Sequence, residues 1–234
     1  MREKLYLLPG TQCDDRLWAP LVTRLFDTVE LVPLAIPMNM GFPDIAELLV
    51  SQLSESTVNL LGFSLGGYVA AEIAVRYPER IARLCVLANS PKPLPTAELE
   101  QRAQALRLID KVGYRGMSRL RAKSLLDPSH HDDEWIDQLI AMDRAQGVEK
   151  LKSQLRDTSD RRDLFAPLSQ WHKPILFCAS EGDDLVDTEW LTRLSKQNAQ
   201  VDVHWISSRG HMLPLEHPDS LADAIRKWLT KVGT

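Results

Sequence analysis

Six short apolar runs, separated by stretches with helical spacing, constrain the fold of this chain more than any other feature. The runs span residues 5–8, 29–34, 58–62, 84–88, 175–179 and 201–206. The middle four are almost continuously apolar, as expected for parallel strands covered on both faces, whereas the last one alternates and is expected at an edge. Helices are predicted between the runs, over residues 14–26, 44–53, 64–77, 188–197 and 218–229. This alternation predicts an α/β fold with a doubly wound, mostly parallel sheet of about six strands.

One long region interrupts the alternation. Residues 91–165 contain no convincing strand, only helical stretches over 96–111, 117–126, 132–146 and 148–157. Three prolines, at positions 91, 93 and 95, form a stiff entry to it. We therefore expect a core made of residues 1–90 and 166–234, with residues 91–165 inserted as a helical lid.

Charge and apolar content exclude several classes of partner. The 234 residues carry a formal net charge of −4, so the chain lacks the basic excess of a nucleic-acid binder. No stretch approaches the roughly 18 apolar residues of a membrane span, and the N-terminal apolar run is too short for a signal peptide. Cys13, Cys85 and Cys178 have neither zinc-ligand spacing nor the density of a disulfide scaffold. We expect a cytoplasmic protein with buried thiols and no nucleic-acid or membrane partner.

The sharpest local motif is Gly62-Phe63-Ser64-Leu65-Gly66-Gly67. It follows an apolar run and precedes a helical stretch, which is the setting of a strand–turn–helix nucleophile elbow. Glycines two residues before and after the serine suit the crowding of such a turn. The hydroxyl of Ser64 would stand at a helix N-terminus, where developing negative charge is stabilised. Ser64 is thus the candidate nucleophile, although a glycine-rich turn of this kind also occurs by chance.

A base is expected on the loop that follows the last strand. His211 lies there, within Ser208-Arg-Gly-His-Met-Leu-Pro214. The other five histidines are interpreted as structural or solvent-facing. His130 and His131 are adjacent on a polar loop and share no preset face, so we predict no metal site and no cofactor.

An acid is needed to orient the imidazole of such a base and to stabilise its charged form. Four carboxylates follow the strand over 175–179: Glu181, Asp183, Asp184 and Asp187. Asp187 precedes a predicted helix and suits a cap. The residues alone leave the choice among the others open.

An oxyanion hole needs two backbone N–H groups. One is expected from Leu65, the residue after the nucleophile, and the other from the loop Pro9-Gly10-Thr11-Gln12 after the first strand. Gly10 allows a close approach, and Thr11 is the preferred donor.

These motifs together resemble the α/β-hydrolase superfamily, in its compact carboxylesterase branch that includes pimeloyl-carrier-protein methyl ester esterases. The chain order of serine, acid and histidine is typical of that superfamily. The resemblance covers most of the core and little of residues 91–165. It is carried by Gly62-Phe-Ser-Leu-Gly-Gly-Tyr-Val-Ala70, Arg76-Tyr-Pro-Glu-Arg-Ile81 and the segments around 84–90, 173–186 and 210–218.

The resemblance also helps to choose the acid. In the family the acid begins an Asp-x-x-Val-Pro segment, which Asp183-Asp-Leu-Val186 matches and which favours Asp183 over Asp184. Two positions depart from the family pattern: Asp187 replaces the family's proline, and Pro9-Gly10 replaces a common His-Gly pair in the oxyanion loop.

The resemblance implies a serine hydrolase that cleaves a small carboxylic ester through an acyl-enzyme. An enol-lactonase or carbon–carbon bond hydrolase would use the same triad, and a non-catalytic binding protein on this fold is the alternative from another class. Trp18, Phe63 and Met117 are candidate walls of an acyl pocket, although such residues are more often core. If residues 107–123 formed one helix, a basic stripe that could dock an acidic carrier protein or a carboxylate would form from Arg107, Lys111, Arg115, Arg119 and Lys123. Gly113 and Gly116 argue against one continuous helix, and the alternative is a solvated helix face neutralised by the acidic residues over 127–137.

Overall fold

The six predicted strands form one sheet in the computed structural model, which describes residues 2–231. Every neighbouring pair of strands is parallel, and the order across the sheet is β2-β1-β3-β4-β5-β6. The expected doubly wound parallel sheet is thereby confirmed. The strands are β1 (Lys4–Leu8), β2 (Glu30–Pro33), β3 (Val58–Phe63), β4 (Ile81–Leu87), β5 (Ile175–Ser180) and β6 (Val201–Ile206).

The burial of each strand follows its place in the sheet. All residues of β3 and β5 are buried, as the continuous apolar runs predicted. The alternating β6 lies at one edge, also as predicted. The prediction that the run over 29–34 is covered on both faces is wrong: β2 is the other edge strand, pairs only with β1, and exposes Glu30 and Pro33.

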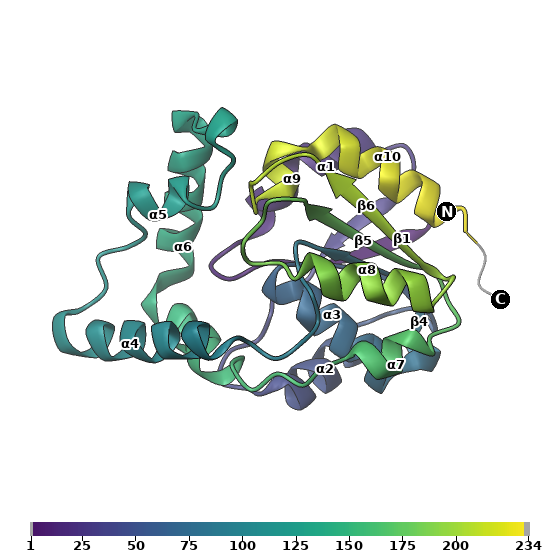
Figure 1. Cartoon of the computed structure of the whole chain (residues 1–234), viewed down its shortest axis with the longest axis horizontal. Coiled ribbons are helices and arrows are strands. Elements are labelled where there is room, and N and C mark those ends of the chain that lie inside the picture. Colours follow the sequence, from purple (N-terminus) through teal and green to yellow (C-terminus); the bar gives the residue numbers. More distant parts are fainter. Residues whose placement is uncertain (1, 232–234) are drawn as a thin grey trace.

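Helices cover both faces of the sheet (Figure 1). On one face lie α1 (Ala19–Leu25) and α10 (Pro218–Leu229), which pack against each other. On the other lie α2 (Phe42–Ser51), α3 (Leu65–Arg76) and α8 (Thr188–Gln197). The predicted helix over 14–26 is divided into the 3-10 helix η1 (Asp15–Trp18) and α1, with a proline in the first turn of α1. Short elements complete the core: η2 (Pro78–Arg80), α7 (Phe165–Ser169) and α9 (Leu213–Glu216).

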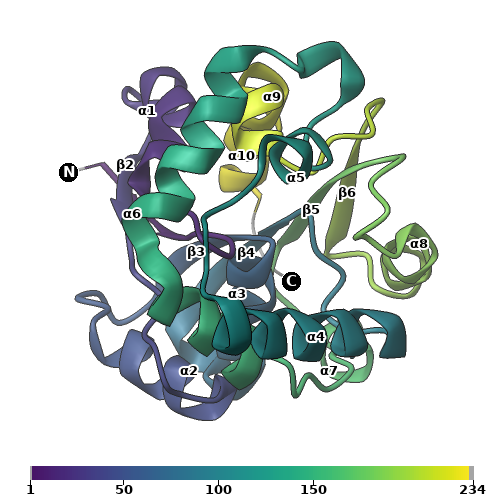
Figure 2. The same cartoon turned by 90° about the vertical axis from the view of Figure 1, so that its left-hand side faces the viewer.

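Residues 91–165 are here called the helical segment, and its helices α4 to α6 lie at the left of Figure 1, beside the sheet and its flanking helices. Seen from that side, they lie across one end of the sheet (Figure 2). The long helix α6 (Asp133–Asp157) packs against both α4 (Thr96–Val112) and α5 (Arg119–Lys123), with η3 (Pro128–His130) between α5 and α6. The helices predicted over 132–146 and 148–157 are the two halves of α6, which kinks where Gly147 has φ 76°.

The basic residues over 107–123 do not lie on one continuous helix, which agrees with the positions of the two glycines in the sequence. Gly113 and Gly116 adopt φ values of 80° and 88°, in the left-handed region that interrupts a right-handed helix. The stripe is therefore divided among α4 (Arg107 and Lys111), the connection (Arg115) and α5 (Arg119 and Lys123). Within residues 2–231, no helix is both long and apolar enough to cross a membrane.

Candidate active site

Ser64 occupies a sharp turn between β3 and α3. Its φ of 52° and ψ of −116° are unusual for a residue with a side chain, and such strain is characteristic of functional positions. The flanking residues must be glycine, because a side chain at either position would collide with neighbouring backbone atoms. A Cβ on Gly62 would lie 2.0 Å from the Gly66 carbonyl oxygen, and one on Gly66 would lie 2.1 Å from that of Leu8. The turn therefore depends on both glycines.

Replacing Gly62 with alanine is expected to lower the free energy of unfolding by at least ~1–3 kcal/mol, because the backbone atoms in contact must separate. Urea unfolding would measure the loss. Gly41→Ala is the matched control, since its Cβ would meet Pro43 at an ordinary 3.7 Å. Similar stabilities of the two variants would contradict this explanation of the turn.

His211 connects Ser64 to Asp183 through a continuous chain of hydrogen bonds. Its Nε2 lies 2.9 Å from Ser64 Oγ, and its Nδ1 lies 2.7 Å from Asp183 Oδ2. His211 is 6% exposed and Asp183 is 5% exposed, so both are largely shielded from water. Asp184 is exposed to solvent. The structure thus brings together the three residues that the sequence indicated, and it places Asp183, rather than Asp184, on the imidazole.

The other acids of this loop lie elsewhere. Asp187 caps α8 by accepting from Trp190 N at 2.9 Å, as the sequence predicted, and it pairs with Lys92. Ser180 Oγ donates to the Gly210 carbonyl at 2.5 Å, which joins the loop of the acid to the loop of the histidine. The position of the imidazole is therefore fixed from both loops.

The turn after β1 lies beside the serine. A Cβ on Gly10 would be 3.3 Å from Ser64 Cβ, so the backbone here passes close to the side chain of the serine. Thr11 and Leu65 N–H donate to no described loop, turn or side-chain acceptor. The N–H of Gln12, in contrast, donates a hydrogen bond to Gln154 Oε1 at 3.0 Å. The N–H groups of Thr11 and Leu65 thus remain candidates for the oxyanion hole.

The three candidate pocket residues differ in accessibility. Trp18 and Phe63 are each 1% exposed, and Phe63 packs its ring 5.2 Å from that of His211. Met117 is half-buried and packs against the core. A pocket wall must offer surface to its ligand, so Met117 is the better candidate of the three, while Phe63 supports the imidazole from behind.

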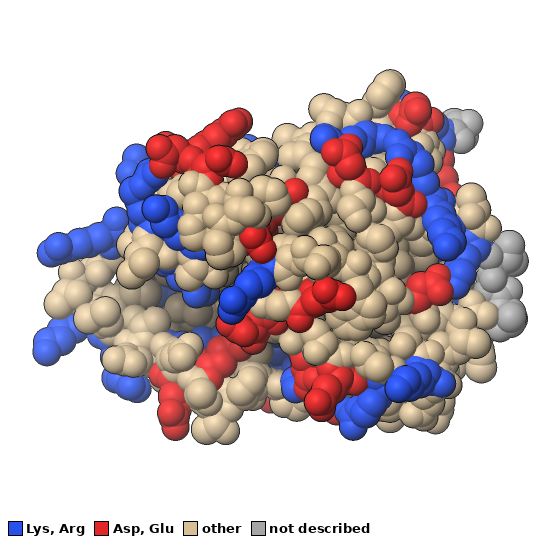
Figure 3. Space-filling model, turned by 45° about the horizontal axis from the view of Figure 1, so that its top comes forward, with Lys and Arg blue, Asp and Glu red and all other residues tan. Residues whose placement is uncertain are grey.

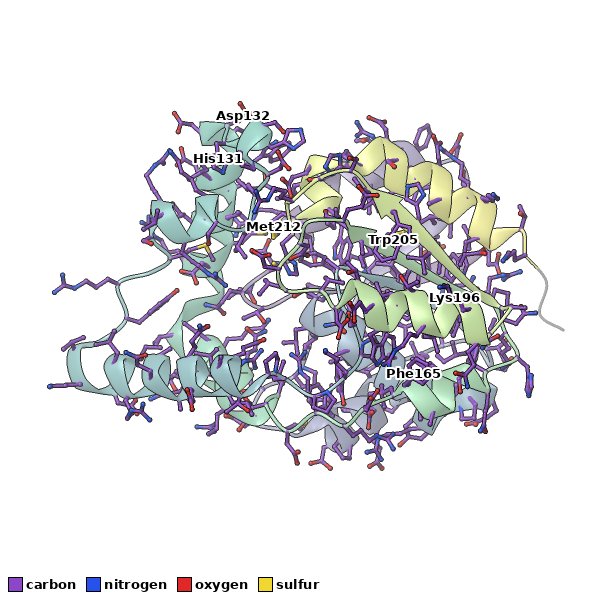
Figure 4. All side chains as sticks on the ribbon, in the orientation of Figure 1. His131, Asp132, Phe165, Lys196, Trp205 and Met212 are labelled. Atoms are coloured by element: carbon purple, nitrogen blue, oxygen red, sulfur yellow. The ribbon has the colours of Figure 1, made fainter. Side chains whose placement is uncertain are left out.

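The helical segment is anchored to the histidine loop. The Leu125 carbonyl accepts from His211 N at 2.8 Å. The carboxylate of Asp127 accepts from Arg209 N at 2.7 Å and from Ser208 Oγ at 3.1 Å. Met212, which follows His211, lies at the junction between α9 and the helical segment (Figure 4). The base is consequently held in part by residues outside the sheet core.

The anchor at Asp127 makes stability depend on pH. Hydrogen bonds from Ser129, and then from Arg209 and Ser208, hold the pKa of Asp127 well below its usual range. A carboxyl whose folded pKa is lowered stabilises the fold fully above its ordinary pKa of about 3.9, and this contribution is lost as the pH falls toward the lowered value. We expect Asp127→Asn to lower the free energy of unfolding at neutral pH and the difference from wild type to shrink below about pH 4.

Urea unfolding at a series of pH values measures this difference. The exposed Asp132, whose side chain makes no capping hydrogen bond, provides the control variant Asp132→Asn. A gap between wild type and Asp127→Asn that stays constant down to about pH 3 would contradict the assignment.

Several residues that shape the site carry no signal in the sequence. Gln12, Asp143 and Gln154 form a buried network beside the oxyanion turn, and Asp127 holds the histidine loop. Gly147 is the residue that indicates part of this arrangement in the sequence, because a glycine within a helical pattern indicates a break.

In the described part of the chain, no group of three or more His, Cys, Asp or Glu side chains is placed to hold a metal ion.

Comparison with known proteins places this geometry in a family. A biotin biosynthesis bifunctional protein BioHC from Cellvibrio japonicus is 26% identical over all of this chain, which spans about half (49%) of that relative. A pimeloyl-[acyl-carrier protein] methyl ester esterase from Pectobacterium carotovorum is 25% identical over 94% of this chain and 92% of its own length. The solved structure of a thermophilic esterase from Thermogutta terrifontis superposes with a TM-score of 0.87 at 23% identity, covering 99% of this chain and 91% of that one.

These similarities agree with the expected hydrolase acting on ester bonds, and the last one confirms the expected fold. The family model described as "Alpha/beta hydrolase family" matches residues 5–224. Because this match covers nearly the whole chain, the chain belongs to the alpha/beta hydrolase family.

Proposed function

We propose that the protein hydrolyses a small carboxylic ester through an acyl-enzyme formed on Ser64. The observation that carries this proposal is the unbroken hydrogen-bonded chain from Asp183 through His211 to the strained Ser64. Nucleophile, base and orienting acid within hydrogen-bond reach are the arrangement that activates a serine.

In the proposed reaction, Ser64 Oγ attacks the ester carbonyl carbon while His211 Nε2 takes the hydroxyl proton. The carbonyl oxygen becomes an oxyanion, which the N–H groups of Thr11 and Leu65 stabilise. Collapse of this intermediate breaks the bond to the alcohol, which receives the proton from His211. Water then repeats the sequence on the acyl-enzyme and releases the acid, and throughout these steps Asp183 keeps Nδ1 of His211 protonated.

The first substrate class to test is a methyl ester carried on an acyl-carrier protein, which is the substrate in the name of the Pectobacterium relative. The helical segment offers a surface for an acidic carrier. Exposed basic residues lie next to exposed Leu108, Val112 and Leu120. Lys and Arg side chains project from this part of the molecule beside a hollow at the left of Figure 3. The basic residues of this surface are Arg107, Lys111, Arg115, Arg121 and Lys123.

In this proposal residues 91–165 act as the lid that carries this docking surface. Arg119 contributes less to it, because it pairs with Asp133 and Asp137 of α6. A docking surface of this kind acts mainly through electrostatic attraction, so carrier-dependent activity should fall as the salt concentration rises.

Labelling by a fluorophosphonate probe, together with hydrolysis of short p-nitrophenyl esters, tests the proposed function. We expect the folded protein to be labelled once per chain and to turn the esters over. A folded protein that is neither labelled nor active would overturn the proposal and favour a binding role. Cleavage of an enol lactone in preference to every ester would support the alternative hydrolase.

A further inference from the structure

We propose that Gln12, Gln154 and Asp143 are positioning residues that hold the oxyanion turn, residues 10–13, in place. Helix α6 of the helical segment, which carries Asp143 and Gln154, is then required for the geometry of the site. This inference rests on the proposed function, because it concerns where the Thr11 N–H is presented.

The oxyanion turn is strained at its third residue. It closes through a hydrogen bond from Cys13 N to the Gly10 carbonyl at 3.2 Å, with Thr11 and Gln12 at its centre. Gln12 has φ 57°, a value that favours glycine or asparagine at this position of a turn. Such a conformation persists only where the surrounding structure holds it. Without its partners, the turn is expected to relax and to reorient the Thr11 amide.

Helix α6 provides the partners that hold Gln12. Gln154 Oε1 accepts from the backbone N of Gln12 at 3.0 Å. The side-chain amide of Gln12 donates to Asp143 Oδ1 at 3.1 Å and to the Gly147 carbonyl at 3.2 Å. Gln12, Asp143 and Gln154 are all less than 5% exposed, so water has little access to replace a lost partner.

The kink in α6 makes this contact possible. Gly147 takes a left-handed φ, so the helix breaks and carbonyls of the preceding turn lose their intrahelical partners. The side-chain amide of Gln12 binds at this break. Asp143 Oδ1 also accepts from Tyr114 Oη at 2.5 Å, and Asp143 Oδ2 accepts from Met117 N at 2.8 Å. The oxyanion turn is therefore joined through one buried carboxylate to the connection between α4 and α5.

Two of the contacts that join the helical segment to the core have distinct roles. Leu125 and Asp127 hold the histidine loop, whereas α6 holds the oxyanion turn. Any opening of the segment that moves α6 would disturb the oxyanion hole, so we expect α6 to stay in place during turnover.

The test replaces Gln154 with methionine, which keeps the length of the side chain and removes the acceptor. Gln138→Met is the matched control, since Gln138 is also on α6 and bonds a backbone group of the N-terminal region, the Arg16 carbonyl at 3.1 Å. The readouts are kcat and KM for a p-nitrophenyl ester and the affinity for a trifluoromethyl ketone, which forms an oxyanion on an activated serine.

Loss of a whole oxyanion donor costs about 10²–10³ in kcat, so a misplaced donor should cost about tenfold. We expect Gln154→Met to lower kcat and ketone affinity by the same factor, with KM changed by less than about twofold. The Gln138→Met control should match wild type. Gln12→Met, which removes the side-chain amide, should repeat the kcat-specific loss and provides the test if Gln154→Met fails to fold.

The outcomes separate the two proposals. A wild type that neither hydrolyses esters nor binds the ketone overturns the proposed function. An active wild type with folded Gln154→Met or Gln12→Met variants that keep its kcat and ketone affinity overturns only the positioning role. The positioning role is equally overturned if these variants change only KM or the melting temperature.

Discussion

Ser64→Ala is expected to abolish covalent labelling and to lower kcat for ester hydrolysis by about 10⁶-fold, the effect of removing the nucleophile of a triad enzyme. The reason is that His211 would then have no hydroxyl to deprotonate, and no acyl-enzyme could form. Stopped assays at high enzyme concentration would measure the residual rate, beside mass spectrometry of the protein after exposure to the probe.

The control is Ser51→Ala, on α2, whose hydroxyl donates to the local Leu48 carbonyl. It should label and turn over like wild type. The hydroxyl that this variant lacks is the one that lies 2.9 Å from His211 Nε2. Substantial labelling of folded Ser64→Ala would therefore mean that a nucleophile other than Ser64 carries the reaction. The acyl-enzyme assigned to Ser64 would then be abandoned.

The parts of the site that the sequence predicted are those set by short-range patterns. The elbow is specified by an apolar strand, two glycines and a helix within a few residues, and the structure shows backbone contacts that explain both glycines. The bounds of α8 and α10 match the predicted helices, because helix-stopping residues and caps are local signals. The cap at Asp187 belongs to the same class of feature.

The parts that escaped prediction depend on contacts between distant residues. Gln12 and Asp143 are separated by 131 positions, and Gln12 and Gln154 by 142. No local pattern indicates that a polar residue after β1 will meet a break in α6. The prediction that the run over 29–34 is covered on both faces is wrong for a related reason, since coverage depends on which strands lie next to each other. Apolar content does not reveal strand order, and β2 pairs with only one neighbour.

The choice between Asp183 and Asp184 shows the limit most clearly. The two residues are adjacent, chemically identical and equally suited to a loop, so composition and spacing could not separate them. Only a family pattern favoured the first. In the structure, Asp183 Oδ1 also accepts from Leu185 N at 3.0 Å, which leaves Oδ2 directed at the imidazole. The turn in the loop, rather than the residue type, decides which carboxylate reaches His211.

Asp183→Asn should therefore lower kcat by about 10⁴-fold, the effect of losing the acid while the geometry is kept. An asparagine can bond the imidazole but does not hold the tautomer that leaves Nε2 free to accept the proton from Ser64, and it cannot balance the charge of the imidazolium. Asp184→Asn is the matched control: its carboxylate is exposed and should matter little. Steady-state kinetics on one p-nitrophenyl ester, with melting temperatures for both variants, makes the comparison. If the two folded variants lost activity equally, the imidazole would be oriented by the charge of the loop as a whole, and the hydrogen bond at 2.7 Å would not be the contact that prepares His211 for catalysis.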